Sequence, residues 1–274
     1  MKKVLVLIMG LFLLVGCSGI HQKTDTDQWS RIEKNKKVII GLDDTFVPMG
    51  FQEKDGSLVG FDVDLARAVF EPLGISVDFQ AIDWDMKEQE LNNQTIDLIW
   101  NGYTRNTERE ALVRFSDTYM KNEQILVTLK SSGIASFQAM QDKIVGMQTN
   151  SAGYDVFNAQ PDILKQYVKD GDDPVLYDGF NEAIIDLKAK RIDGLLIDRV
   201  YANYYLEQAG EFDQYHLISG GFDSEDFAVG ARKSDKKLVA VINQQFKKLV
   251  QSGEFEKISV KWFGENVAPE DLLK

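Results

Sequence analysis

Two successive series of strand-like runs and helical segments constrain the fold of this chain more than any other feature. Short apolar runs, several of them rich in β-branched residues, predict buried strands, and segments with apolar residues at helical spacing follow them. The expected strands lie at residues 36–41, 75–79, 96–100, 143–147, 174–177 and 194–198. Strands that alternate with helices indicate mostly parallel sheets covered on both faces. Because the two series are similar in build, the sequence predicts an α/β protein with two lobes.

The positions at which the second series begins and ends predict how the lobes are connected. A strand-like segment precedes the second series, and a Gly-containing break follows it. We therefore expect the chain to cross between the lobes twice, near residues 121–126 and 219–225. The expected division is residues 29–122 with 225–274 for lobe 1, and residues 123–224 for lobe 2.

Composition excludes several classes of function. The chain has 274 residues, enough for two ordinary domains, and a formal net charge of -12, which argues against a nucleic-acid-binding protein. His21 and His216 are too few and too far apart for a zinc site, and the single cysteine excludes a disulfide framework. No Gly-rich phosphate loop follows the first strand. We expect no metal and no cofactor.

The first residues have the pattern of an export signal. A basic start is followed by an apolar run from Val4 to Val15, and Leu14-Val15-Gly16-Cys17 resembles a bacterial lipobox. The resemblance implies a signal peptide at residues 1–16, cleavage before Cys17 and lipid, such as palmitate, on its thiol. Residues 17–28 would then be the lipidated cysteine and a polar tether, with the protein held on the extracytoplasmic face of the cell membrane. The alternatives are a plain signal peptide or a buried thiol.

The segment from Trp100 to Arg109 is the first candidate for a binding site. It leaves the end of an expected strand, passes Gly102 and Thr104, and enters a helix whose N-cap is Asn106 or Thr107. Ligands of open α/β sheets bind at such strand ends. Free backbone N–H groups, a hydroxyl group and the Arg109 guanidinium group would together suit a carboxylate. The alternative is an exposed arginine on a surface helix.

Three further motifs occur with this segment in a fixed order. They are Leu58 to Leu65, the run Phe115-Ser116-Asp117 with Tyr119, and Arg191-Ile192-Asp193-Gly194 leading to Asp198. From about residue 38 to residue 263 the chain resembles the amino-acid-binding (family 3) solute-binding proteins of ABC importers, which have the type II periplasmic-binding-protein fold. The resemblance implies a monomer whose two lobes close like a hinge on a free amino acid. It also implies a membrane permease as partner.

The resemblance assigns roles to individual residues. Arg109 matches the arginine that binds the α-carboxylate, and Thr104 matches the hydroxyl residue beside it. Gly102 matches the position whose carbonyl accepts from the α-ammonium group, and Asp198 matches the acid that pairs with it. Ser151 matches the residue whose N–H and O–H complete the carboxylate site. Asp198 has an alternative role as the N-cap of the following helix.

The side chain of the ligand would meet a second group of residues. Phe46 and Trp84 match aromatic positions that sandwich the ligand, and Asp43 matches one that can contact its side chain. Ala152 stands where the family has a hydroxyl residue, so its contact would be through the backbone N–H. For both aromatic residues the alternative is ordinary core packing. Asp43 and the aromatic walls permit a cationic amino acid, and they equally suit glutamine or cystine.

An enzyme on the same fold is the rival class of function, for example a lyase or dehydratase acting on an amino-acid-like substrate. It would need a general acid or base in the cleft, whereas every carboxylate placed there already has a binding role. A sensor domain is a third class, which would need a transmembrane span or a signalling domain. We therefore expect a binding protein with no catalytic residues.

Overall fold

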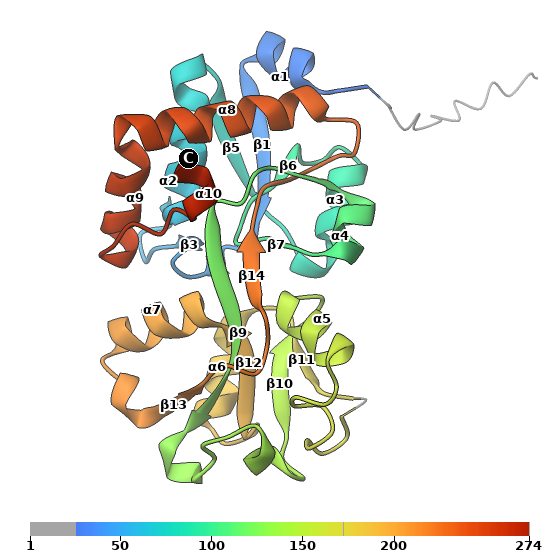
Figure 1. Cartoon of the computed structure of the whole chain (residues 1–274), viewed down its shortest axis with the longest axis vertical. Coiled ribbons are helices and arrows are strands. Elements are labelled where there is room, and N and C mark those ends of the chain that lie inside the picture. The colour runs from blue at the N-terminus through green and yellow to red at the C-terminus, as the bar shows by residue number, and fades with distance from the viewer. Residues whose placement is uncertain (1–25, 172, 274) are drawn as a thin grey trace, which may run out of the picture.

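The computed structural model describes residues 26–171 and 173–273, and it has two lobes joined by two paired strands (Figure 1). The predicted two-lobed α/β fold is confirmed. The expected signal peptide and the expected lipid site at Cys17 lie outside the described residues. Among the residues that are described, no helix is long and apolar enough to cross a membrane.

Lobe 1 is built on a five-stranded sheet with the order β5-β1-β6-β15-β8. These strands are β1 (Lys37–Leu42), β5 (Ser76–Ala81), β6 (Leu98–Ile99), β8 (Arg114–Phe115) and β15 (Gly230–Ala231). The apolar run of β1 explains its central place, because Val38, Ile40 and Leu42 are all buried. β1 pairs in parallel with β5 and β6, which places the ends of β1 and β6 at one edge of the sheet.

Helices cover both faces of this sheet. They are α1 (Trp29–Asn35), α2 (Phe61–Phe70), α3 (Lys87–Asn92), α4 (Thr107–Leu112), α8 (Lys236–Ser252), α9 (Glu254–Phe263) and α10 (Glu270–Leu273), with 3-10 turns at Glu71–Leu73 and Trp84–Met86. In α8, Leu238, Ile242 and Phe246 recur at helical spacing and are fully buried. The Phe246 ring lies 5.7 Å from the Trp100 ring, so α8 covers the strand that leads into the candidate site.

The second lobe contains most of a seven-stranded sheet, with the order β11-β10-β12-β9-β14-β7 and β13 also paired with β9. Its strands are β7 (Thr104–Arg105), β9 (Met120–Leu129), β10 (Val145–Gln148), β11 (Val175–Tyr177), β12 (Gly194–Asp198), β13 (Tyr215–Ile218) and β14 (Ser224–Phe227). The helices of this lobe are α5 (Ala152–Ala159), α6 (Phe180–Lys188) and α7 (Arg199–Ala209), with 3-10 turns at Lys130–Ser132, Gln138–Met140 and Phe212–Gln214.

The expectation of mostly parallel sheets is wrong. In lobe 2, β10 is parallel to β11 and β12, but β9 is antiparallel to β12, β13 and β14. The reason is the connection between the lobes: a strand that leaves a lobe and a strand that returns must run in opposite directions. In lobe 1, β15 is likewise antiparallel to β6 and β8, so both sheets are mixed.

The two crossings lie side by side. β9 and β14 pair in antiparallel register, with Asn122 opposite Glu225 and Met120 opposite Phe227 (Figure 1). The first crossing lies where it was expected, and the second is a strand centred a few residues later than expected. β14 also pairs with β7, so Thr104 is opposite Phe227. A residue of the candidate site is thus fixed directly to a crossing strand.

Several elements were not expected from the sequence. Between the first and second expected strands, the structure contains a small sheet of β2 (Thr45–Phe46), β3 (Gly50–Gln52) and β4 (Leu58–Val59). The expected tether also ends earlier than residue 28. Gln28 is buried, and its N–H donates to Asp235 Oδ1 at 2.8 Å. Gln28 therefore belongs to the folded domain and not to the tether.

Candidate functional site

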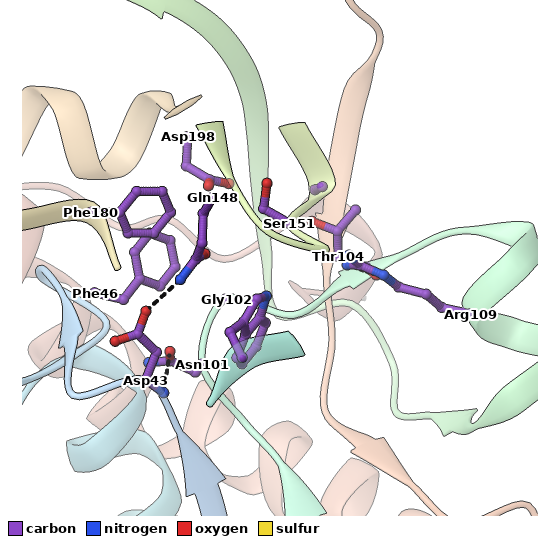
Figure 2. A pocket seen from close by; sticks show the side chains of 12 residues that line it. Asp43, Phe46, Asn101, Gly102, Thr104, Arg109, Gln148, Ser151, Phe180 and Asp198 are labelled. Atoms are coloured by element: carbon purple, nitrogen blue, oxygen red, sulfur yellow. Dashed lines mark hydrogen bonds between the residues drawn. The ribbon is translucent and has the colours of Figure 1, made fainter. Parts of the chain in front are cut away.

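A cleft between the lobes gathers all nine residues that the sequence indicated for ligand binding. Its lining is Asp43, Phe46, Trp84, Asn101, Gly102, Thr104, Arg109, Gln148, Ser151, Ala152, Phe180 and Asp198. Figure 2 shows residues of lobe 1 facing residues of lobe 2 across this space. Asn101, Gln148 and Phe180 are additions that sequence reasoning did not assign. The alternative of an exposed arginine is excluded, because only 5% of Arg109 is exposed.

Arg109 lies at one end of the cleft, in the first turn of α4. Asn106 is the N-cap of this helix, as expected, and its Oδ1 accepts from the Arg109 N–H at 2.8 Å. The guanidinium group donates to Thr104 O at 3.2 Å and stacks over the Tyr103 ring at 4.9 Å. It also forms an ion pair of 2.9 Å with Asp155 of lobe 2. A cation at this end is therefore oriented by both lobes.

Gly102 occupies a position that only glycine fits well. Its φ is +56°, and an added Cβ would lie 2.5 Å from Phe46 Cε1. The Gly102 N–H donates to Asp62 Oδ2 at 2.7 Å, and Tyr119 donates to the same oxygen at 3.0 Å. Burial raises the pKa of Asp62 to about 7. The turn that contains Gly102 is thus fixed by a hydrogen bond to the buried carboxyl group of Asp62.

Ser151 and Ala152 belong to the opposite lobe. Ser151 is the N-cap of α5, and its side chain accepts from the Tyr154 N–H at 3.2 Å. The Ser151 N–H donates to Gln148 O at 3.3 Å, so its hydroxyl group is the donor left for a ligand. Ala152 opens α5, where backbone N–H groups have no partner within the helix. Asn150 before them adopts φ +51°, which asparagine tolerates better than most residues.

Asp198 lies at the end of β12 with a second acid behind it. Asp198 Oδ1 accepts from Asn122 Nδ2 at 2.7 Å and Gln124 Nε2 at 2.8 Å. The same two amides donate to Glu225 Oε2, at 3.0 and 3.1 Å. Burial, followed by the nearby Glu225, raises the pKa of Asp198 to about 8. Burial likewise raises the pKa of Glu225.

Asp43 and Gln148 meet across the cleft. Asp43 Oδ1 accepts from Thr45 N at 2.9 Å and Thr45 Oγ1 at 2.7 Å, while Oδ2 accepts from Gln148 Nε2 at 2.7 Å (Figure 2). Asn101 Oδ1 accepts from the Asp43 N–H at 3.1 Å and fixes its backbone. Burial raises the pKa of Asp43, and the hydrogen bonds from Thr45 and Gln148 oppose this shift.

Aromatic rings close the side of the cleft near Asp43. Phe46 of lobe 1 packs on Phe180 at 5.3 Å and on Tyr201 at 6.1 Å, both from lobe 2. Trp84 instead packs edge to face on Tyr103 at 5.9 Å. The two aromatic side chains thus line the cleft and also pack in the hydrophobic cores.

Further contacts between the lobes surround the cleft. The Lys87 ammonium group donates to Asn150 O at 3.0 Å, and Arg109 donates to the same oxygen at 3.1 Å. Asn150 Nδ2 in turn donates to Asp85 Oδ1 at 3.2 Å. Burial, together with the charge of Arg109, lowers the pKa of Lys87 to about 8. The lobes are therefore in direct contact around the site.

Glu225 and Gln148 are the residues that sequence reasoning missed with most consequence. Gln148 is the last residue of a strand, as Asp198 is, and this position could have indicated that its side chain lies at the ligand site. Glu225 has no such signal, because the pairing of β14 with β9 joins segments about a hundred residues apart.

Comparison with known proteins agrees with this architecture. Residues 38–265 match the family of bacterial extracellular solute-binding proteins, family 3. The arginine-binding extracellular protein ArtP of Bacillus subtilis is 27% identical over 96% of this chain and 98% of its own length. The L-cystine-binding protein TcyJ of Escherichia coli is also 27% identical, over 95% of this chain and 96% of its own.

Two solved structures are more similar in sequence. A substrate-binding protein of an ABC uptake transporter from Streptococcus pneumoniae, with bound histidine, is 56% identical, with a TM-score of 0.88 over 89% of this chain and 99% of its own. A substrate-binding protein of a polar amino acid ABC uptake transporter from Streptococcus thermophilus is 58% identical, with a TM-score of 0.60 over 92% of this chain and 95% of its own. Since the family match covers most of the chain, this protein is a member of the bacterial extracellular solute-binding proteins, family 3.

Proposed function

We propose that this protein captures a free amino acid in the cleft between its lobes and delivers it to the membrane permease of an ABC importer. The main support for this proposal is that groups of opposite charge line the same cleft: Arg109 from lobe 1 and Asp198 from lobe 2. A free amino acid needs both an anion donor and a cation acceptor a few ångströms apart. Relatives named for arginine and cystine, and a similar solved structure with bound histidine, support the same class of ligand.

The roles of the lining residues follow from their chemistry. Arg109, the Ser151 hydroxyl group and the Ala152 N–H supply donors for the α-carboxylate. Asp198 and the backbone carbonyl group of Gly102 supply the acceptors for the α-ammonium group. Phe46 and Trp84 form apolar walls for the side chain of the ligand.

Asp43 supports histidine as the first ligand to test. Thr45 occupies one of its carboxylate oxygens twice, and Gln148 occupies the other once. A carboxylate has about four acceptor positions, so the capacity left lies mainly on Oδ2. A single N–H donor such as an imidazole suits this arrangement, whereas a guanidinium group binds best to two free oxygens. The bound histidine of the Streptococcus pneumoniae protein agrees with this choice.

Calorimetric titration with L-histidine, L-arginine, L-glutamine and L-cystine tests the proposal. We expect histidine to bind most tightly and Asp43→Asn to weaken histidine more than glutamine. Tighter binding of arginine than of histidine would refute the side-chain assignment while leaving amino-acid capture intact. Recovery of unchanged amino acid after long incubation is expected of a binding protein, and chemical conversion would favour the lyase or dehydratase.

We also infer that the lobes comprise residues 29–122 with 225–274 and residues 123–224, and that β9 and β14 act as the hinge. The TM-scores support this: two relatives of similar identity differ in overall superposition, as rotation of one lobe would cause. A ligand that touches both lobes favours the closed form. Small-angle scattering should show a smaller radius of gyration with ligand, and an unchanged radius would favour a preformed pocket.

Finally, we propose that the protein is a monomeric lipoprotein anchored through Cys17. A single acyl chain binds a membrane only marginally, whereas two chains anchor it stably. The Cys17→Ser variant should therefore leave the membrane fraction while retaining its affinity for amino acid. Persistent sedimentation of this variant with membranes would contradict the anchor.

A further inference from the structure

The acid pair of Asp198 and Glu225 has an unusual set of contacts. Each of two amides, from Asn122 and Gln124 on β9, donates one hydrogen bond to each carboxylate. All four amide hydrogens are therefore shared between the same two oxygens, which holds the two carboxylates close together. Thr104 Oγ1 adds a fifth, longer hydrogen bond of 3.3 Å to Glu225 Oε2.

The three groups that donate these five hydrogen bonds are all neutral. Only 6% of Asp198 and 6% of Glu225 is exposed, so water screens their repulsion poorly. Two buried carboxyl groups that accept from the same amide nitrogens lie too close together for both to ionise readily. One proton shared between them removes the repulsion. Glu225 Oε1 is also buried without a hydrogen-bond partner among the described residues. A bare carboxylate oxygen in that setting is costly.

Among the described residues, the nearby cations form their ion pairs with other acids, so none of them neutralises Asp198 or Glu225 by direct contact. Arg109 lowers the pKa of both acids through its charge, but its own ion pair is with Asp155. Side chains alternate along β9 and β14, so Lys121 and Asp226 point to the other face and pair with each other. Glu123 on that face pairs with Arg199 of α7. The pair therefore has neutral donors on its own face and balanced charges on the other.

We propose that Glu225 is a second acid of the amino-acid site: it shares one proton with Asp198 in the ligand-free cleft, and the α-ammonium group of the ligand displaces this proton to solvent. The inference rests on the proposed function. Asp198 lines the cleft, whereas Glu225 is not part of its lining, so the ammonium group contacts Asp198 and Glu225 acts through it. The positive charge of the ammonium group thus replaces the positive charge of the released proton.

The pair also links the ligand to the hinge. Asp198 ends β12 in lobe 2, Thr104 lies on β7, which pairs with β14, and Asn122 and Glu225 face each other on the two crossing strands. Loss of the shared proton changes the charge at the point where these four segments meet. Glu225 is therefore a positioning residue whose effect on binding depends on pH.

Calorimetry with L-histidine in two buffers of different ionisation enthalpy, at pH 7, counts the protons released on binding. The wild type should release about one proton more than Glu225→Gln, and its affinity should rise by up to about tenfold per pH unit from pH 6 to 7. Comparing the two proteins cancels any proton exchanged by the imidazole. Glu225→Asp, which keeps the acid, should restore the release, and Glu123→Gln on the opposite face of β9 should match the wild type.

Infrared difference spectra of the wild type provide a reading that does not depend on the variants folding. Adding L-histidine should remove a carbonyl band of a protonated carboxyl group. Tight histidine binding without loss of that band, or equal proton release by the wild type and Glu225→Gln, would overturn the role of Glu225 and leave the proposed function standing. A wild type that binds no amino acid would overturn both.

Discussion

The two ends of the cleft differ in how their charges are balanced. At one end Arg109 is paired with the Asp155 carboxylate and two backbone carbonyls, so an anion is already present beside the cation. At the other end, the described residues offer Asp198 and Glu225 neutral donors: two amides shared by both acids, and a hydroxyl group that donates to Glu225. The cation is thus held ready by fixed partners, whereas the acids need a positive charge from outside. Ligand binding is therefore expected to change protonation at the acid end and little at the arginine end.

Removing Arg109 should have the largest effect. Arg109→Ala leaves the α-carboxylate of the ligand without its charged donor, at a cost of about 2–5 kcal/mol, or roughly thirty-fold to several thousand-fold in affinity. Arg105→Ala is the matched control, because Arg105 is exposed and forms its ion pair with its near neighbour Glu110. Calorimetry that places Arg109→Ala within a few-fold of this control would remove Arg109 from the site.

Neutralising Asp198 should cost less, because its amide partners can rearrange around an isostere. For Asp198→Asn we expect a loss of about 1.5–3 kcal/mol, or roughly tenfold to a hundredfold. The same measurement on Asp226→Asn, an acid on the outer face of β14, should give wild-type affinity. An unaffected Asp198→Asn protein would mean that the acid end does not contact the ammonium group.

Gly102 tests whether the turn on the lobe 1 side is rigid. Gly102→Ala combines a strained φ with a collision against Phe46, so the free energy of unfolding should fall by about 1–3 kcal/mol. Gly74→Ala isolates the strain alone, since Gly74 has a φ of +68° and open space around its added Cβ. Urea denaturation should find the larger loss in Gly102→Ala, and equal losses would mean that the turn yields to the new methyl group.

Asp62 offers a single buried acid to compare with the pair. Its pKa is raised from 3.8 to about 7 by burial, so the folded state binds the proton more tightly than the unfolded state. The stability of the wild type relative to Asp62→Asn should therefore fall as the pH rises from about 4 to about 7, by on the order of 1 kcal/mol between pH 6 and 7. Asp55→Asn is the control, because hydrogen bonds from Ser57 lower the pKa of that exposed acid. Parallel curves of wild type and Asp62→Asn in this window would contradict the shift.

Local patterns predicted the parts of the site that lie at strand ends. Arg109 lies in the first turn of the helix that Asn106 caps, and Asp198 is the last residue of the buried strand β12. The small sheet of β2, β3 and β4 escaped prediction because its strands have two or three residues, too few to show a period. Glu225 escaped because its role arises from long-range pairing of the two crossings. The mixed direction of the strands has the same origin.

The packing of Phe46 against Phe180 and Tyr201 has a consequence for affinity. These rings come from different lobes, and any opening that parts them exposes apolar surface to water. Part of the free energy that closes the lobes is therefore supplied by the protein itself. The measured affinity becomes the affinity of the closed cleft multiplied by the fraction of molecules that are closed without ligand. Substitutions of Tyr201, behind the cleft, would then tune uptake by changing that fraction, and two relatives with identical ligand contacts could differ in how much ligand they need.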